Sequence, residues 1–528
     1  MSSSKPTAPR TPKSAALVAT GILLSRFSGL IRVWATNRYF GLSDEADVFT
    51  QAFKIPNLLQ NLFGEGALSA SFIPVYSSLV SRGNRREADH VAGAVASILA
   101  LVVSVVVLIG VLATPLLVPL ITIGFEGEKL ELTIQVVRIL FPGAGLLVMS
   151  AWCLGILNSH HKFLLSYTAP VLWNAAMIAT LFLYGAHTEL SRLAVILAWG
   201  SVVGSALQFL IQVPVVRRLA PDLRFAWNTT SEHVRTVLRN FVPAFVSRGV
   251  VQLSAYIDTM LASLLPTAGA SAALFNAQIL YTLPVSLFGM SVSAAELPAM
   301  SGALGTDPEG AETVRRRLDA GLRQIAFFVL PSAVAFLALG DVVAGLMQSG
   351  RFTQSDAVYV WGILAGSAVG LLASTLGRLY SSTYYALRDT RTPLRYALVR
   401  VALTTVLGYV FAFYVPQWLN IAEMWGAAGL TASAGIAGWF EMALLRRTLN
   451  ARIGKTGLPP SYVLKLAIAA LTGAAVAWGV KLSLPAIHPI AAAVPILGAY
   501  GLVYFVITAA FRVPEISRVL SRFQRRRG

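Results

Sequence analysis

Long apolar segments follow one another along almost the entire chain, and this repetition limits what the chain can fold into. A helix that spans the hydrocarbon core of a bilayer needs about 20 apolar residues, and helices are favoured because lipid offers the backbone no hydrogen-bond partners. Alternating strands of about ten residues, typical of membrane barrels, are not visible in the sequence. We predict helices near residues 15–39, 46–80, 91–120, 130–157, 164–186, 191–216, 236–264, 271–300, 318–347, 356–386, 395–416, 423–446, 461–484 and 488–511. The predicted fold class is an all-α integral membrane protein with about 14 transmembrane helices and no sizeable soluble domain.

Basic residues lie between the apolar segments and are concentrated on one side of the predicted topology. Only 12% of the 528 residues are charged, and the formal net charge is +18, whereas about a quarter of a soluble domain is charged. Cytoplasmic loops are enriched in lysine and arginine, so the charge indicates a multi-pass topology and no nucleic-acid partner. The opposite side carries little more than Lys129, Arg192, Arg351 and Lys481. Both the N-terminus and the C-terminus are therefore expected in the cytoplasm.

A faint internal repeat predicts how the helices are grouped. The stretch 68–74 resembles 292–298, and 24–26 resembles 246–248 at nearly the same offset, with six predicted helices between the partners. Parallel repeats flanking a central cavity are a common transporter plan. We predict two parallel-related six-helix lobes around a central cavity, an N-lobe over 1–230 and a C-lobe over 231–455. Helices 13 and 14 and a basic cytoplasmic tail would occupy 456–528.

The first predicted helix carries two arginines at a depth where lipid is expected. An arginine at the bilayer centre costs roughly 2.5–3.5 kcal/mol on insertion scales, so it usually faces a cavity or a partner. Arg26 lies near the helix centre and is expected to face a cavity. Arg32 lies a turn and a half later. A cavity position and snorkelling to the interface are both open for Arg32.

The second predicted helix carries a polar stripe. Its members recur at steps of three and four residues and fall within about 120° of arc on a helical wheel. They are Asp47, Gln51, Lys54, Asn57, Asn61 and Glu65. A water-filled cavity is the favoured interpretation, and a polar seam buried against another helix is the alternative. Proline and glycine at Pro56, Gly64, Gly66 and Pro74 predict that this long helix bends or breaks.

Two further ionisable residues, Arg248 and Asp258, share the seventh predicted helix. They form either an ion site or a pair that couples the two lobes, and both interpretations are open. Arginine and lysine in a cavity predict an anionic ligand, because guanidinium groups match phosphate bidentately. The sequence shows no Walker A loop, no HExxH pair and no ligand-spaced Cys/His cluster. We therefore predict a transporter and not an enzyme, without a metal site or a cofactor. The sequence does not distinguish whether transport is driven by a coupling ion (Na+ or H+) or by the membrane potential.

Several stretches resemble the signature of the MviN/MurJ lipid II flippase family. The resemblance covers predicted helices 1 to 12 in order, and the helix 2 motif is its most specific part. The matching stretches are Ser25-Arg26-Phe27-Ser28-Gly29-Leu30-Ile31-Arg32, Asp47, Ala52-Phe53-Lys54-Ile55-Pro56-Asn57-Leu58-Leu59, Gly64-Glu65-Gly66-Ala67-Leu68-Ser69, Phe72-Ile73-Pro74, Gly350-Arg351-Phe352-Thr353 and Tyr384-Tyr385-Ala386-Leu387-Arg388-Asp389-Thr390-Arg391-Thr392-Pro393.

The resemblance implies a fold, a function and a set of site residues. The family has the fourteen-helix fold of the multidrug/oligosaccharidyl-lipid/polysaccharide exporter superfamily. It moves the undecaprenyl-pyrophosphate-linked peptidoglycan precursor lipid II from the inner to the outer leaflet of the bacterial cytoplasmic (inner) membrane by alternating access. Expected partners are lipid II or another polyprenyl-pyrophosphate glycan, membrane lipids and the cell-wall synthesis machinery. The positions that carry over to the transport cavity are Arg26, Arg32, Asp47 and Lys54, with Asn57 and Glu65 in support.

The sequence departs from the family pattern at a few positions that would line this cavity. Gln60 and Asn61 stand where the family often has a basic pair, and Gln278 and Ile279 stand where many members have an acidic-basic pair in helix 8. A flippase for another polyprenyl-phosphate-linked oligosaccharide, of the O-antigen or teichoic type, is therefore the main alternative. A cation-drug antiporter would need a mainly acidic cavity, and a polytopic glycan polymerase would need a catalytic carboxylate and a large outer loop.

Overall fold

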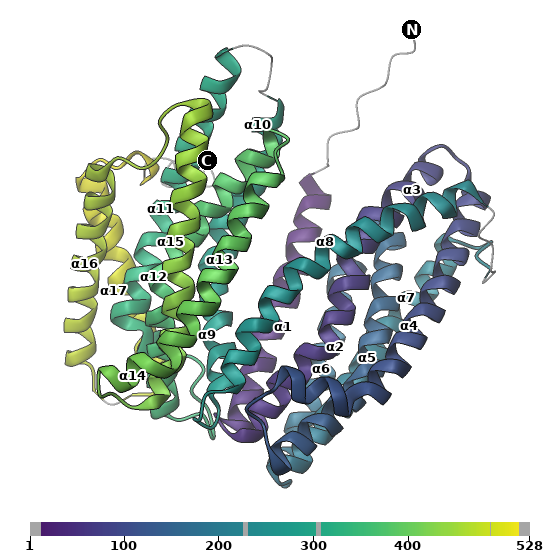
Figure 1. The fold of residues 1–528 in the computed structure, drawn as a ribbon, viewed down its shortest axis with the longest axis horizontal. Coiled ribbons are helices and arrows are strands. Elements are labelled where there is room, and N and C mark those ends of the chain that lie inside the picture. The colour runs from purple at the N-terminus through teal and green to yellow at the C-terminus, as the bar shows by residue number, and fades with distance from the viewer. Residues whose placement is uncertain (1–11, 225–230, 303–307, 486, 517–528) are drawn as a thin grey trace. The chain divides into compact units, whose positions relative to one another are not determined.

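The computed structural model describes residues 12–224, 231–302, 308–485 and 487–516, and these residues form helices joined by short loops (Figure 1). Each of the predicted apolar segments coincides with a helix or with a run of consecutive helices. Eleven helices among the described residues are long and apolar enough to cross a membrane. The remaining predicted segments coincide with α1, with the run from α2 to α3, and with α8, which carry the ionisable residues singled out in the sequence. The all-helical membrane fold class is thus confirmed.

The helices fall into two compact units, and unit 1 contains residues 1–264 and 349–351. Within it α1 packs against α6, α6 against α7, and α5 against α2, α4 and α7. Helix α8 contacts α2, α3, α4 and η1 and therefore belongs to unit 1. The helices of unit 1 are α1 (Pro12–Phe40), α2 (Asp44–Leu62), η1 (Phe63–Leu68), α3 (Ser69–Ser81), α4 (Arg85–Ile121), α5 (Gly127–Ser159), α6 (Phe163–Tyr184), α7 (Leu190–Leu219) and α8 (Glu232–Ser263). The grouping of the sequence into repeats at 1–230 and 231–455 stays a prediction.

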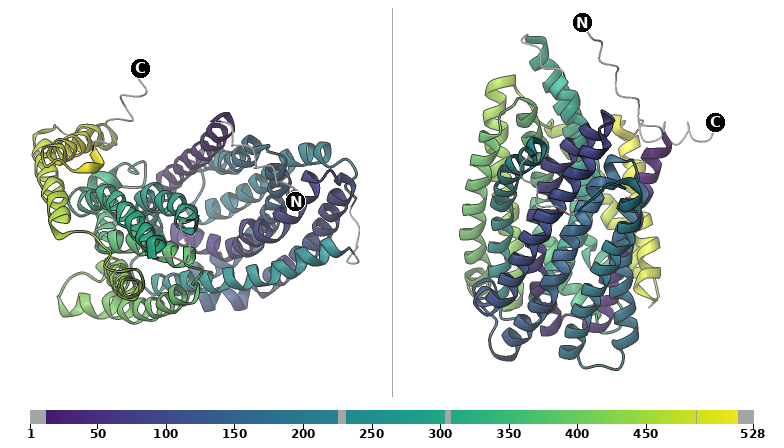
Figure 2. Two further views of the ribbon diagram at one scale, coloured as in Figure 1. Left: turned by 90° about the horizontal axis from the view of Figure 1, so that it is seen from above. Right: turned by 90° about the vertical axis from the view of Figure 1, so that its right-hand side faces the viewer.

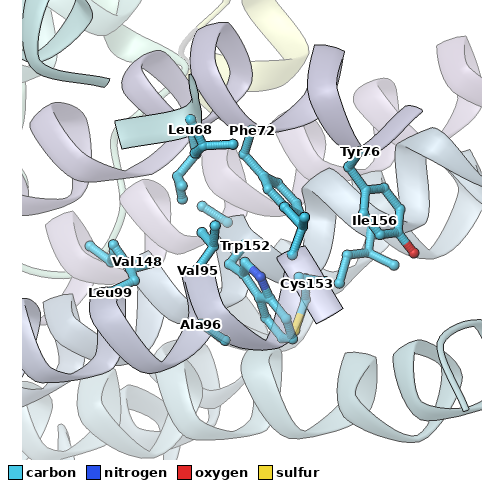
Figure 3. Packing of buried hydrophobic residues seen from close by; sticks show 14 of the residues in the cluster. Leu68, Phe72, Tyr76, Val95, Ala96, Leu99, Val148, Trp152, Cys153 and Ile156 are labelled. Carbon is cyan, nitrogen blue, oxygen red and sulfur yellow. The ribbon is translucent and has the colours of Figure 1, made fainter. Parts of the chain in front are cut away.

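The second predicted segment is broken, as its prolines and glycines predicted. Gly64 has φ −76° and ψ −120°, which are not helical values, and the π-helical turn η1 lies between α2 and α3. Leu68 and Phe72, on the far side of the break, are buried against Val95 of α4 and Trp152 of α5 (Figure 3). Lipid is as apolar as these side chains, so the hydrophobic effect does not bring membrane helices together, and close packing of this kind holds them instead. The break therefore lets α2 and α3 follow different directions while the core fixes α3.

Unit 2 contains residues 265–348 and 352–528 and is built around α12, which packs against α9, α11 and α15. A Cβ on Gly370 would collide with the backbone of Gly435, so glycine permits the close approach of α12 and α15. The helices of unit 2 are α9 (Ala270–Pro284), η2 (Val285–Met290), α10 (Ser291–Gly302), α11 (Pro308–Gly345), α12 (Gln354–Ala386), α13 (Arg391–Tyr409), η3 (Val410–Tyr414), α14 (Val415–Trp418), η4 (Glu423–Trp425), α15 (Gly426–Ile453), α16 (Pro460–Ser483) and α17 (Pro489–Ala510).

The last two helices, α16 and α17, form a hairpin that packs along α11 at one edge of unit 2 (Figure 2). The hydroxyl of Tyr500 donates a hydrogen bond to the carbonyl oxygen of Pro331 at 2.6 Å. Pro331 has no amide hydrogen, so the carbonyl oxygen of Phe327, four residues earlier in α11, lacks its helical donor and accepts a hydrogen bond from the hydroxyl of Tyr504 at 2.5 Å. Lys481 of α16 forms an ion pair with Asp341 of α11. Polar contacts thus fix the hairpin to α11.

The Gly350-Arg351 signature forms a tight turn between α11 and α12. Gly350 has φ +54°, a left-handed conformation that favours glycine. The amide of Arg351 donates to the carbonyl oxygen of Arg38 at 2.9 Å, and Arg38 Nη1 donates to Ser349 Oγ at 3.2 Å. The turn therefore belongs to unit 1, although the residues on either side of it belong to unit 2.

The family signature that contains Asp389 lies at the start of α13. The Asp389 carboxylate accepts hydrogen bonds from the amides of Arg391 and Thr392, both at 3.0 Å, and from Arg452 Nη1 at 2.7 Å. The hydrogen bonds from Thr392, together with Arg452, hold the pKa of Asp389 below its usual range. This part of the family signature therefore has a structural role at the start of a helix.

Candidate functional site

Arg32 of α1 is held by residues of α6. Its Nε donates a hydrogen bond to Asn174 Oδ1 at 2.9 Å, and its guanidinium carbon lies 4.9 Å from the centre of the Trp173 ring. Asn174 Nδ2 donates in turn to Ser28 Oγ at 3.0 Å, one helical turn before Arg32. We call Arg32, Asn174, Trp173 and Ser28 the Arg32 network. Arg32 is thus fixed by protein contacts at its Nε and on one face of its guanidinium group.

Arg26 has a different environment. It is exposed in unit 1, and its neighbours Leu23 and Phe27 on α1 are 65% and 64% exposed. Among the described residues Arg26 has no hydrogen-bond or ion-pair partner. The two arginines of helix 1 therefore differ: Arg32 is oriented by residues of α6, whereas Arg26, for which the sequence favoured a cavity, has no such contact among the described residues.

The start of the polar stripe on α2 is buried against α5. Asp47 is 2% exposed, and its Oδ2 forms an ion pair with Lys129 Nζ at 3.0 Å. Lys129 also contacts Asp44, which is exposed, at 2.6 Å, and lies 4.3 Å from the centre of the Phe125 ring. Asp47 thus contributes to a charge cluster that joins α2 to the beginning of α5. This burial fits the polar-seam interpretation for this end of the stripe.

The middle of the stripe contacts α8. Gln51 Nε2 donates to the carbonyl oxygen of Thr259 at 3.4 Å, and Lys54 Nζ donates to the hydroxyl of the same threonine at 3.3 Å. Tyr256, also on α8, donates from its hydroxyl to the carbonyl oxygen of Lys54 at 2.9 Å. Gln51 and Lys54 are therefore placed together by α8, four and seven residues beyond Asp47.

The end of the stripe is more open. Asn57 and Asn61 are half-buried. The structure does not describe the side chains of Glu65, Arg248 and Asp258. The stripe is thus a seam at Asp47 and becomes accessible towards η1. The cavity interpretation remains a prediction for that accessible part.

Chemically, the described part of this arrangement presents nitrogen donors, of which Arg32 is fixed by its neighbours. Arg32, Arg26 and Lys54 supply cations from α1 and α2, while the buried carboxylate of Asp47 is already paired with Lys129. Within the described residues, no group of three or more His, Cys, Asp or Glu side chains is placed to hold a metal ion. Such a site is suited to an anion with several oxygen acceptors.

Sequence reasoning did not identify three residues of this arrangement. Lys129 was counted only as a charge of an outer loop, and Trp173 and Asn174 lie in an apolar segment that gave no sign of a function. An asparagine inside a predicted membrane span is itself a signal, because a polar side chain in lipid needs a partner. That signal does not identify the partner, which lies 142 residues away in the sequence.

Comparison with known proteins places these features in a family context. The model of the family described as lipid II flippase MurJ matches residues 36–494. The lipid II flippase MurJ of Burkholderia cenocepacia is 32% identical over 437 residues, which are 81% of this chain and 82% of the relative. A probable lipid II flippase MurJ of Rhizobium tropici is 29% identical over 446 residues, 82% of this chain and 80% of the relative.

Solved structures resemble the fold as well. A structure of the lipid II flippase MurJ in an inward closed conformation superposes with a TM-score of 0.77 at 23% identity, covering 95% of this chain and 100% of that one. An inward-facing multidrug resistance transporter of the MATE family, in the MOP superfamily, superposes with a TM-score of 0.66 at 18% identity, covering 82% of this chain and 94% of that one. At these identities the structural likeness establishes the shared fold.

Proposed function

We propose, because this chain belongs to the family of the lipid II flippase MurJ, that it moves lipid II from the inner to the outer leaflet of the bacterial cytoplasmic membrane. Family membership makes it a multi-pass transporter of the inner membrane. The direction of movement and alternating access are parts of the proposal. So is the assignment of substrate contacts to Arg26, Arg32, Lys54 and Asn57.

The observation that carries the proposal is the fixed guanidinium group of Arg32. A charged side chain in a membrane helix is costly unless a partner or an aqueous site compensates for it. Among the contacts of the described residues, Asn174 and Trp173 satisfy one donor and one face of this group. No other described residue bonds to the terminal nitrogens, which could therefore bind a pyrophosphate, whose oxygens match the planar donors of arginine.

Alternating access supplies the movement in this proposal. The lobes predicted from the repeat, 1–230 and 231–455, would open the cationic site first to the inner and then to the outer leaflet. Arg248 and Asp258 are proposed as an ion site or as a pair that couples the lobes. Asp47 would act on the balance between the two states and not on substrate affinity, because it is engaged by Lys129.

A second candidate function is transport of another polyprenyl-phosphate-linked oligosaccharide. Uncharged side chains at Gln60, Asn61 and Gln278 favour it, and Gln278 is exposed in unit 2, where its amide donates to Thr282 of the same helix. A site with fewer cations would suit a lipid-linked oligosaccharide that carries less negative charge than lipid II. The two candidates share the fold and differ in the glycan.

The test is complementation of a bacterial strain depleted of its own lipid II flippase. Expression of this chain is expected to restore growth and to lower the lipid II that accumulates in the inner leaflet. The matched control is the Arg32→Ala variant, which should reach the membrane in equal amounts and fail to rescue. Membrane insertion without any fall in inner-leaflet lipid II would contradict the proposal and leave the second candidate.

Both termini are proposed to lie in the cytoplasm, and cysteine labelling tests this orientation. The one natural cysteine, Cys153, is fully buried and should give little background. Arg85→Cys and Arg316→Cys, both at exposed positions, should be protected from an impermeant thiol reagent in intact spheroplasts. His187→Cys, exposed in the loop after α6, should react. The reverse pattern would show that the positive charges do not set the topology.

A further inference from the structure

The hydrogen bonds of Arg32 leave one edge of its guanidinium group unused. Arginine has five N–H donors in a planar arrangement and no acceptor. Nε uses its single donor on Asn174 Oδ1 at 2.9 Å. Within the part of the chain that the structure describes, Nη1 and Nη2 make no hydrogen bond, and Arg32 is only half-buried. The edge formed by Nη1 and Nη2 is therefore the part of Arg32 that can receive a ligand.

The orientation of the Asn174 amide follows from its partners. Because arginine can only donate, the oxygen of Asn174 must face Arg32 and the nitrogen must face Ser28. Ser28 Oγ accepts from Asn174 Nδ2 at 3.0 Å and donates to the carbonyl oxygen of Ser25 at 2.9 Å. The three donors, Arg32 Nε, Asn174 Nδ2 and Ser28 Oγ, are therefore each matched to one acceptor. Asn174 is 5% exposed, so it can influence a ligand only through Arg32.

Trp173 is fixed as well, and it supports the face of the guanidinium group. Its Nε1 donates to Ser201 Oγ of α7 at 3.1 Å, and its ring packs against Phe53 of α2 with centroids 5.6 Å apart. An arginine stacked on an aromatic ring is attracted to the negative face of that ring. Helices α2, α6 and α7 therefore combine to hold Arg32 of α1 in one plane.

We propose that Asn174 and Trp173 are positioning residues, which aim the Nη1–Nη2 edge of Arg32 at two oxygens of the substrate's pyrophosphate. This inference rests on the proposed function and adds the groups that orient the substrate contact. A guanidinium group fixed at Nε and on one face loses little rotational freedom when it binds, which favours a bidentate contact over a diffuse charge. The signature residue Ser28 has a role in the same network, because it fixes the Asn174 amide.

The test uses a double-mutant cycle with lipid II as the probe, measured by native mass spectrometry on purified variants. Asn174→Leu preserves the side chain's size and removes the acceptor, and it is expected to weaken lipid II binding about tenfold. In the Arg32→Lys background the same substitution should change binding by less than about twofold, since lysine has no Nε–H to orient. Trp173→Leu should behave in the same way as Asn174→Leu.

Two controls separate positioning from stability. Thr168→Ala removes a hydroxyl on the same helix whose one bond among the described residues is to the carbonyl oxygen of Leu164, and it should leave binding unchanged. Asn174→Asp retains the acceptor and adds a negative charge beside Arg32, so it should retain the thermal stability and weaken anion binding. This variant keeps the test decisive if Asn174→Leu fails to fold.

Each outcome has a distinct meaning. If Asn174→Leu weakened lipid II binding equally in the wild-type protein and in Arg32→Lys, the positioning role would be overturned, because the effect would then not pass through Arg32. Unchanged binding in Asn174→Asp would overturn it too. Normal lipid II binding by Arg32→Ala would instead overturn the proposed function itself.

Discussion

Lys129→Met is expected to destabilise the protein more than any other single change in the charge cluster at the start of α2. Lys129 is the cation that faces the buried carboxylate of Asp47 at 3.0 Å. Removing one member of a buried ion pair costs up to about 3–5 kcal/mol, because the remaining charge is left in a medium that solvates it poorly. The value should lie towards the lower end, since Lys129 is itself 22% exposed. The measurement is thermal unfolding of the purified protein in detergent, together with the amount found in the membrane.

The cluster offers matched controls for this prediction. Asp44 contacts the same lysine but is 57% exposed, so Asp44→Asn should cost no more than about 1 kcal/mol. Combining Asp47→Asn with Lys129→Met removes both charges and should restore much of the lost stability. If Lys129→Met and Asp44→Asn had equal unfolding temperatures, the buried pair would contribute nothing beyond a surface contact.

The helices could be predicted from the sequence because their cause is local. An apolar run of sufficient length in lipid must be helical, whatever the rest of the chain does. The break at Gly64 is local as well, because proline and glycine weaken a helix where they stand. Periodicity also grouped Asp47, Gln51 and Lys54 on one face of α2, and all three side chains contact neighbouring helices.

The partners of these residues could not be predicted, because they come from distant parts of the chain. Lys129 lies 82 residues from Asp47, and Thr259 lies 205 residues from Lys54. The spacing on one helix says which side chains share a face, but not which helix covers that face. The polar stripe consequently divides into a buried seam and an accessible end, whereas its sequence pattern is uniform. The distinction between Arg26 and Arg32 has the same origin, since the partners that hold Arg32 lie on α6, where Asn174 is 142 residues away.

Arg32→Lys is expected to reduce lipid II transport by roughly 100-fold, whereas Arg26→Lys should reduce it less than about tenfold. Lysine retains the positive charge at either position but has neither the Nε–H nor the planar group. At position 32 it would lose the hydrogen bond to Asn174 and the contact with Trp173, which together account for the predicted loss. At position 26 no comparable contact exists among the described residues, so we expect the charge alone to suffice there.

Transport of a fluorescent lipid II analogue in proteoliposomes measures this difference. Arg26→Ala and Arg32→Ala provide the reference for complete loss of each charge, and the amount of folded, reconstituted protein corrects each rate. If Arg32 acts through its fixed geometry, Arg32→Lys should transport about as slowly as Arg32→Ala. At position 26, Arg26→Lys should transport faster than Arg26→Ala. If both lysine variants transported equally well, charge alone would suffice, and the contacts from α6 would have no part in recognising the substrate. The comparison therefore separates geometry from charge at two arginines of a single helix.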